Sequence, residues 1–211
     1  QPVANDVHLQ PGRGVIVTGA NMAGKSTYLR SVGIAAVLAN AIGTCPASSW
    51  RGRPLRVRSL IGRADDLAAG KSYYQVEADG VVALLGDAAR MEPTLFILDE
   101  LLRGTNTVER LAAGEAVLRA MLTQTPTARH AVLVATHDGE LVGLLRDCYA
   151  SVHFRETIGS DGLSFDYRVR VGPASTRTAI ALLEATGAPA SVVEAARARA
   201  EQLDGASTST P

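Results

Sequence analysis

The segment from Gly19 to Ser26 most constrains what this chain can fold into, because it fits the spacing G-x-x-x-x-G-K-[ST] at every fixed position. A β-branched run at residues 15–18 precedes it and predicts a buried strand. After it, apolar residues at helical spacing predict a helix from Lys25 to Ile42. In such a strand–loop–helix unit, backbone N–H groups close around phosphate oxygens and the helix N-terminus adds partial positive charge. The sequence therefore predicts a nucleoside-triphosphate site.

The side chains of this loop have distinct expected roles. We expect Lys25 to reach the β- and γ-phosphates and the Ser26 hydroxyl to ligate Mg²⁺. The residues of this segment expected to contact the nucleotide are Gly19, Asn21, Met22, Ala23, Gly24, Lys25, Ser26 and Thr27.

Two further strand ends carry residues suited to hydrolysis. An apolar run at residues 94–98 predicts a strand that ends directly in Asp99 and Glu100. Asp99 is expected to hold Mg²⁺ through water or the serine hydroxyl of the loop, and Glu100 to orient and deprotonate an attacking water. A third apolar run at residues 131–135 leads to His137, where an imidazole can sense the γ-phosphate. The expected catalytic residues are Lys25, Glu100 and His137, and an acid directly after the magnesium aspartate is typical of ABC-type ATPases.

Strands and helices alternate along the chain, which is typical of an α/β domain built around a parallel sheet. We predict the fold of a P-loop NTPase of the ABC-ATPase type, with a mostly parallel sheet flanked by helices. Residues 1–204 are expected to form the domain and residues 205–211 a disordered tail. Residues 45–58 are predicted to be a loop or an edge hairpin. The other predicted elements are helices at 76–91, about 107–122 and 176–186, a hairpin at 151–156 and 163–171, and a last helix after Pro189, with capping boxes at Asn106/Glu109 and Ser191/Glu194.

The composition limits the classes of function. The formal net charge is zero, so any DNA contact must lie in one local patch or in another domain. One basic cluster can either meet DNA phosphates or an adjoining domain, or form a solvated loop and strand face; its members are Arg51, Arg53, Arg56, Arg58 and Arg63. Cys45 and Cys148 lack metal-ligand spacing and are expected to be small buried or inert thiols. No segment is long and apolar enough to cross a bilayer, so we expect a soluble, cytoplasmic domain without a membrane partner.

Four segments together carry a family resemblance. They are Thr-Gly-Ala-Asn-Met-Ala-Gly-Lys-Ser-Thr-Tyr-Leu-Arg at residues 18–30, Asp-Asp-Leu-Ala-Ala-Gly-Lys-Ser at 65–72, Asp-Glu-Leu-Leu-Arg-Gly-Thr-Asn-Thr at 99–107 and Ala-Thr-His at 135–137. In this order they resemble motifs of the MutS family of DNA mismatch-repair ATPases. The likeness runs from about Asn5 to Ala200, which corresponds to the C-terminal ATPase domain of that family.

The resemblance implies that the domain binds ATP with Mg²⁺ and forms a head-to-tail homodimer with composite ATP sites. Ser72 matches a signature serine that touches the γ-phosphate held by the other subunit, and residues 103–107 match a loop at that interface. Asn5 lies in the stretch that lines the nucleotide base. Tyr167 matches a position whose ring stacks on adenine, or it is an ordinary strand tyrosine. DNA is contacted through other domains of the full-length protein.

The chain departs from the family pattern near Glu100. Leu102 stands where the family usually has glycine and Asn106 where it has serine, and residues 108–113 lack the usual Tyr-Asp-Gly. In this respect the chain is more similar to the shorter, divergent MutS-related proteins of bacteria. We expect ATP hydrolysis that couples nucleotide state and dimerisation to DNA binding in mismatch repair or a related DNA-maintenance process. The alternative is an ATP-gated dimerisation module that turns over negligibly when isolated and does not act on mismatches.

Overall fold

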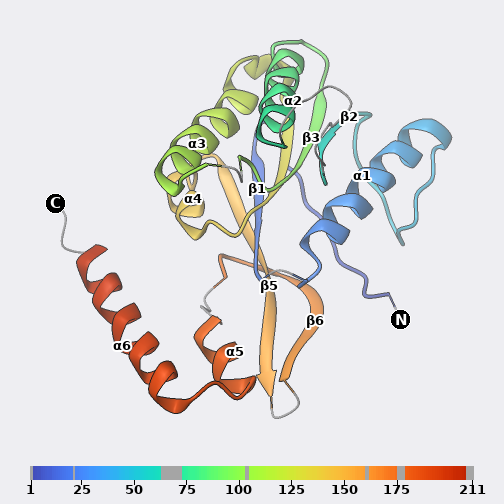
Figure 1. Ribbon diagram of the computed structural model, residues 1–211. Helices are drawn as coiled ribbons and strands as arrows, with labels where there is room; N and C mark the ends of the chain where they lie inside the picture. Colours follow the sequence, from blue (N-terminus) through green and yellow to red (C-terminus); the bar gives the residue numbers. More distant parts are fainter. Residues whose placement is uncertain are drawn as a thin grey trace.

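The computed structural model has a central β-sheet with helices on both faces (Figure 1). It describes residues 2–20, 22–62, 73–102, 105–159, 162–174 and 179–207. Within these residues, six strands form one sheet in the order β2-β3-β4-β1-β5-β6, and only the β5–β6 pair is antiparallel. The strands are β1 Gly14–Thr18, β2 Arg56–Leu60, β3 Thr94–Asp99, β4 Ala131–Ala135, β5 Tyr149–Gly159 and β6 Gly162–Val171. The α-helices are α1 Lys25–Ile42, α2 Tyr73–Ala88, α3 Thr107–Thr123, α4 Gly139–Leu144, α5 Ala179–Ala185 and α6 Ala190–Ser207.

Two hydrophobic cores lie on opposite faces of the sheet, because successive side chains of a strand point to opposite sides. Helix α1 covers one face, where Leu29 and Val32 pack with Val17 of β1. Helices α2, α3 and α4 cover the other face, where Leu118 packs with Ile16 of β1. The central strands are therefore buried on both sides, which explains why they are continuous apolar runs in the sequence. Figure 1 shows α1 separated from α2–α4 by the sheet, and α5 and α6 at the end of the long β5–β6 hairpin.

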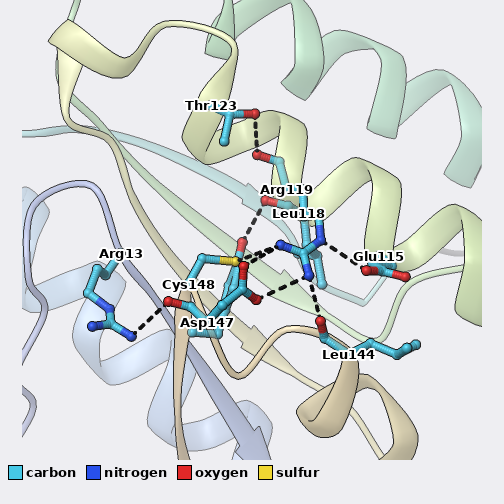
Figure 2. A network of polar contacts seen from close by, with 9 residues as sticks. Arg13, Glu115, Leu118, Arg119, Thr123, Leu144, Asp147 and Cys148 are labelled. Carbon is cyan, nitrogen blue, oxygen red and sulfur yellow. Dashed lines mark hydrogen bonds and ion pairs between the residues drawn. The ribbon is translucent and has the colours of Figure 1, made fainter.

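Arg119 of α3 ties this helix to the connection between α4 and β5, as Figure 2 shows. Its guanidinium donates to the Asp147 carboxylate at 2.8 and 3.1 Å, to the Leu144 carbonyl at 2.6 Å and to Glu115 at 2.9 Å. Arg13, just before β1, donates to the Asp147 carbonyl at 3.3 Å. The hydrogen bond from Arg119 lowers the pKa of Asp147 to about 2. The Asp147 carboxylate therefore stays ionised beside Arg119 over the whole range in which ordinary carboxyl groups are ionised.

The two cysteines are free and partly buried. Cys148 lies beside this network, and burial raises the pKa of its thiol. A raised thiol pKa disfavours the thiolate, which is the nucleophilic form. Cys148 is therefore poorly suited to nucleophilic chemistry, in line with the expectation of an inert thiol.

The structure confirms most of the predicted helices and strands, but several of them begin or end at other residues than predicted. The helix Lys25–Ile42, the strand Ala131–Ala135 and the antiparallel hairpin are confirmed. The helix expected at 76–91 instead spans Tyr73–Ala88. The last helix begins at Ala190, so Ser191 lies inside it and is not its cap, and the helix continues to Ser207, into the segment expected to be a tail. Residues 175–178 and 208–211 lie outside the described residues, so α5 is described only from Ala179.

The region predicted as a loop or an edge hairpin ends in a parallel edge strand instead. Strand β2 pairs in parallel with β3, from Arg56 opposite Thr94 to Leu60 opposite Leu98. Its alternate residues Arg56 and Arg58 both reach the buried Asp87 of α2, at 3.1 and 2.6 Å. The two arginines, which alternate along this strand, therefore both pair with the carboxylate of Asp87.

The same contacts change the interpretation of the basic cluster. Arg53 donates to the carbonyls of Ala128 and Arg129 at 3.2 and 2.6 Å, and Arg56 also reaches Glu92 at 3.5 Å. Three of the five arginines are thus engaged within the fold, and Arg63 lies outside the described residues. These contacts favour a structural role for the cluster over a surface for DNA phosphates.

No helix among the described residues is long and apolar enough to cross a membrane.

Candidate functional site

The Gly19–Ser26 loop follows β1 and opens α1, as the motif predicts. Gly19 has φ of 129°, and a Cβ there would lie 2.6 Å from the Phe154 carbonyl oxygen of β5, so only glycine fits without a shift. Gly24 caps α1 in a left-handed conformation with φ of 105°. The loop is therefore held against β5 by backbone geometry that depends on its two glycines.

Lys25 folds back over this loop. Its ammonium donates to the carbonyls of Gly19 and Ala20 at 2.7 and 2.9 Å, and the side chain is only 5% exposed. These bonds place the positive charge inside the loop, close to the backbone N–H groups at the start of α1. An incoming phosphate would therefore meet a charge that the loop itself holds in position.

The other loop residues differ in exposure. Ala23 is buried, Ser26 is partly buried in the first turn of α1 and Thr27 is exposed. Met22 is 84% exposed and has a left-handed φ of 70°, which is unusual for a side chain other than glycine. Asn21 lies outside the described residues. The loop tip thus presents an exposed, conformationally strained residue to solvent.

The three strands named in the sequence prediction end along one edge of the sheet. Strand β4 lies between β1 and β3, and Asp99, Ala135 and Val17 are in register across them. The hydrogen bonds continue beyond the strands, because Thr136 N–H donates to the Val17 carbonyl at 3.0 Å and Glu100 N–H donates to the Ala135 carbonyl at 2.9 Å. The loop, His137 and the two carboxylates consequently lie at the carboxyl ends of adjacent parallel strands, where ligands bind in open α/β sheets.

Glu100 and His137 are in direct contact. The Glu100 Oε2 atom lies 3.1 Å from His137 Nδ1. Glu100 is 7% exposed and has a left-handed φ of 56°, whereas the His137 side chain is 49% exposed. The strained turn directs a buried carboxylate towards a solvent-accessible imidazole, which is a geometry suited to a base whose orientation a second group fixes.

Asp138, for which the sequence predicted no role, extends this pair. Its carboxylate receives two hydrogen bonds from Arg110 of α3, both 2.8 Å, and its Oδ1 lies 3.8 Å from His137 Nε2. The hydrogen bonds from Arg110 lower the pKa of Asp138 and raise that of Arg110. The position of Asp138 directly after His137 is a signal that could have identified it.

Glu77 is a second residue near the site for which the sequence predicted no role. It lies in the first two turns of α2, is 3% exposed and accepts a 2.6 Å hydrogen bond from Leu102 N–H. This bond joins α2 to the turn that carries Glu100. The sequence contains no local signal for it, because the two partners are 25 residues apart.

Asn5 and Tyr167 are brought together although they are 162 residues apart in the chain. The Asn5 amide donates to the Tyr167 carbonyl at 2.8 Å and accepts from Val169 N–H at 2.7 Å. Tyr167 has φ of 55°, and the Tyr167 ring atom Cδ1 lies 3.3 Å from where a Cβ on Gly24 would be. The aromatic ring thus adjoins the residue that caps α1, beside the Gly19–Ser26 loop.

The residues expected at a subunit interface are described only in part. Ser72, Arg103 and Gly104 lie outside the described residues. Asn106 caps α3 by accepting from Glu109 N–H at 3.0 Å, which confirms the predicted capping position. The Glu109 carboxylate accepts from the Thr105 hydroxyl at 2.7 Å.

The donor set fits Mg²⁺ held together with phosphate oxygens. No group of three or more His, Cys, Asp or Glu side chains among the described residues could hold a metal ion on its own. Mg²⁺ is usually bound by one or two protein oxygens, with substrate phosphates and waters completing its shell. Asp99 at the end of β3 and Ser26 in the first turn of α1 are the two oxygen donors that the motif supplies, and both are partly buried at the same edge.

The comparison with protein families agrees with this geometry. The family model of MutS domain V matches residues 15–204, which include the loop, Asp99, Glu100 and His137. The MutS family is an ATPase family whose members work as dimers on DNA in mismatch repair. The chain belongs to the MutS family and comprises its domain V.

Proposed function

We propose that this chain is a P-loop NTPase of the ABC-ATPase type that binds and hydrolyses ATP with Mg²⁺. The observation that carries the proposal is the meeting of three groups at one sheet edge. Lys25 is buried in the Gly19–Ser26 loop, and the Glu100–His137 pair lies at the ends of the neighbouring strands. Hydrolysis of a phosphoanhydride requires a positive charge beside the phosphates and a base for the attacking water, and these groups could supply both.

In the proposed reaction, Glu100 takes a proton from a water that attacks the γ-phosphorus in line, while the bond to the ADP oxygen breaks. His137 fixes the orientation of the Glu100 carboxylate through the 3.1 Å contact. Lys25 offsets negative charge on the phosphates. Asp99 and Ser26 are the residues that would hold Mg²⁺, which when bound supplies further neutralisation of charge.

We further propose that two copies form composite sites, with Ser72 of a partner subunit reaching the γ-phosphate. The family works as dimers, and the turn after Glu100 is bonded to Glu77, five residues beyond Ser72 in the chain. Closure of a dimer around ATP would thereby act on the turn that orients Glu100. In the full-length protein this cycle would couple to DNA binding in mismatch repair or a related DNA-maintenance process.

One observation favours the alternative of a nucleotide-gated dimerisation module with negligible turnover. Lys25 and Glu100 are both engaged by groups of their own chain, namely the loop carbonyls and His137. A single chain would then bind ATP but hydrolyse it only after a second chain has associated.

Two substitutions test the proposal on this chain. Glu100→Gln keeps the size of the side chain but removes the base, so ATP affinity should stay within about twofold while turnover falls by about 100-fold or more. Lys25→Ala should abolish detectable ATP binding, because the loop loses its internal charge. Binding is measured by titration calorimetry with Mg-ATP and turnover by phosphate release.

Glu201→Gln is the matched control, since Glu201 is an exposed carboxylate on α6. It should leave both quantities unchanged. Unchanged turnover in Glu100→Gln would contradict the role of Glu100, and retained ATP affinity in Lys25→Ala would contradict the phosphate-binding loop.

A further inference from the structure

The N-terminal segment before β1 contacts two elements that adjoin the Gly19–Ser26 loop. Asn5 bonds to β6 on one side of it. Next to Asn5, the Asp6 carbonyl accepts a 3.0 Å hydrogen bond from the Tyr28 hydroxyl of α1. Burial raises the pKa of Tyr28 to about 12, so this hydroxyl remains a donor at any physiological pH. The segment is therefore anchored to the helix that the loop opens and to the strand that carries Tyr167.

The anchored part of β6 is a bulge. Phe154 of β5 pairs with Val169 and Glu156 pairs with Phe165, so residues 166–168 face Arg155 alone. Backbone groups inside such a bulge lack partners across the ladder. The carbonyl of Tyr167, inside the bulge, accepts a hydrogen bond from the Asn5 amide. The N–H of Val169, which pairs with Phe154 directly after the bulge, donates to the oxygen of the same amide.

Two side chains hold this bulge from different directions. Asp166 accepts from Arg168 N–H at 3.0 Å and pairs with Arg170, whose hydrogen bond lowers the pKa of Asp166 to about 2. The Asn5 amide, 162 residues away in the chain, bonds to the carbonyl of Tyr167 in the same bulge. Between them Tyr167 has φ of 55°, a conformation that an L-residue with a side chain rarely adopts without support.

The bulge decides where the Tyr167 ring lies. Tyr167 is 47% exposed, and its ring packs near Phe165, with the two ring centroids 6.0 Å apart. Its Cδ1 atom lies 3.3 Å from the position that a Cβ on Gly24 would occupy. A regular strand would remove two residues from this part of β6 and change the direction of the ring. An exposed aromatic ring beside a phosphate-binding loop offers a stacking surface for a nucleobase.

From these contacts we infer that Asn5 is a positioning residue, which sets Tyr167 as the stacking surface for the base of the bound nucleotide. This inference rests on the proposed function. Asn5 would act on the base through Tyr167, because both hydrogen-bonding atoms of its amide are used by β6.

The test compares a nucleotide with a ligand that lacks a base. Mg-ATP and Mg-tripolyphosphate are titrated into wild type, Asn5→Ala, Tyr167→Ala and the double variant. Asn5→Ala and Tyr167→Ala should each weaken ATP binding by about tenfold, as expected for loss of one stacked base. Tripolyphosphate binding should change by less than about twofold, and the double variant should bind ATP no more weakly than Tyr167→Ala.

Two further variants separate positioning from general damage. Asn5→Asp keeps the acceptor for Val169 N–H but loses the donor for Tyr167, so its ATP affinity should fall between wild type and Asn5→Ala. His8→Ala changes an exposed side chain of the same segment and should have no effect. Equal weakening of ATP and tripolyphosphate by Asn5→Ala, or additive effects in the double variant, would overturn the inference.

A ligand-free measurement keeps this inference distinguishable from the proposed function. With fluorotyrosine incorporated, the Tyr167 resonance should shift in Asn5→Ala and stay in place in His8→Ala. An unmoved resonance in Asn5→Ala would overturn the positioning role even if ATP binds. Absence of ATP binding by the wild type would instead overturn the proposed function, and with it the assignment of Tyr167 to a base.

Discussion

At Leu102 the backbone conformation favours glycine, whereas burial in the core favours a large apolar side chain. Its φ of 57° is left-handed, which costs a residue with a side chain roughly 1–2 kcal/mol. Its side chain is nevertheless 8% exposed and packs in the core beneath α2 and α3. The family pattern that the chain resembles has glycine here, and the left-handed backbone explains that preference. In this chain, burial of the leucine side chain offsets the strain of the turn after Glu100.

This conflict predicts a reversal of the usual order of alanine and glycine. At Leu102, the glycine variant should be more stable than the alanine variant by about 1 kcal/mol, because only alanine retains the strained Cβ. At Leu118, which is fully buried in the middle of α3, alanine should instead be more stable than glycine by about 1 kcal/mol. Urea denaturation of the four variants measures both differences. The same order at both sites would show that Leu102 is not strained.

At the scale of elements, the site depends on ties between the end of one strand and a neighbouring helix. Arg110 of α3 holds Asp138 after β4, and Glu77 of α2 holds Leu102 after β3. Both ties fix a turn that carries a candidate catalytic side chain. Because α2 and α3 lie on the same face of the sheet, movement of either helix would be transmitted to the Glu100–His137 pair.

The Arg110–Asp138 tie predicts a pH-dependent contribution to stability. Hydrogen bonds from Arg110 hold the pKa of Asp138 below its usual 3.8 in the folded state. The stabilisation is therefore complete at pH values above about 4 and is lost as the pH falls through the lowered pKa. Asp138→Asn should be less stable than wild type by about 1–2 kcal/mol at pH 7, since the side chain is almost fully buried.

Urea denaturation of the two proteins between pH 7 and pH 3 measures this difference. The gap should be constant down to about pH 4 and shrink below it. Asp166→Asn is a useful comparison, because Asp166 is an exposed carboxylate whose pKa is also lowered, by its hydrogen bond from Arg170. A gap for Asp138→Asn that does not change with pH would exclude the ionised pair as its source.

At the scale of the whole molecule, the arrangement of the sheet brings the candidate site together. Strand β4 lies between β1 and β3, so His137 is placed between the Gly19–Ser26 loop and Glu100. The two cores pack helices against both faces of the sheet, and these residues lie at its carboxyl edge. The β5–β6 hairpin then extends past the loop and supplies Tyr167.

The proposed composite site predicts that turnover depends on association. If a partner subunit supplies Ser72, the rate of ATP hydrolysis per chain should rise with protein concentration as dimers form. Phosphate release and light scattering on the same samples measure both quantities, with Lys25→Ala as the control that should show no turnover at any concentration. A constant rate per chain in a strictly monomeric protein would contradict action in trans, and binding with almost no turnover would favour the gated module.

Local signals predicted much of the fold. The bounds of α1 and β4 follow from runs of apolar residues next to glycine or polar residues, and the cap of α3 follows from the spacing of Asn106 and Glu109. Strand β2 was missed, because its alternating arginines are satisfied by Asp87, 31 residues away from Arg56. The start of the last helix directly after Pro189 is confirmed, but Ser191 is not its cap, because it lies inside the first turn although it has the spacing of a capping box.

The sequence by itself determined the loop, its glycines and the acidic and histidine residues at three strand ends, since each depends on neighbours within a few positions. The tertiary structure decided how these residues meet. The Glu100–His137 contact follows from the pairing of β3 with β4, and the Asn5–Tyr167 clamp joins residues 162 positions apart. Spacing along a chain predicts local hydrogen bonds and periodic burial. Contacts across the sheet depend on strand order and on a bulge, which no local pattern in this sequence encodes.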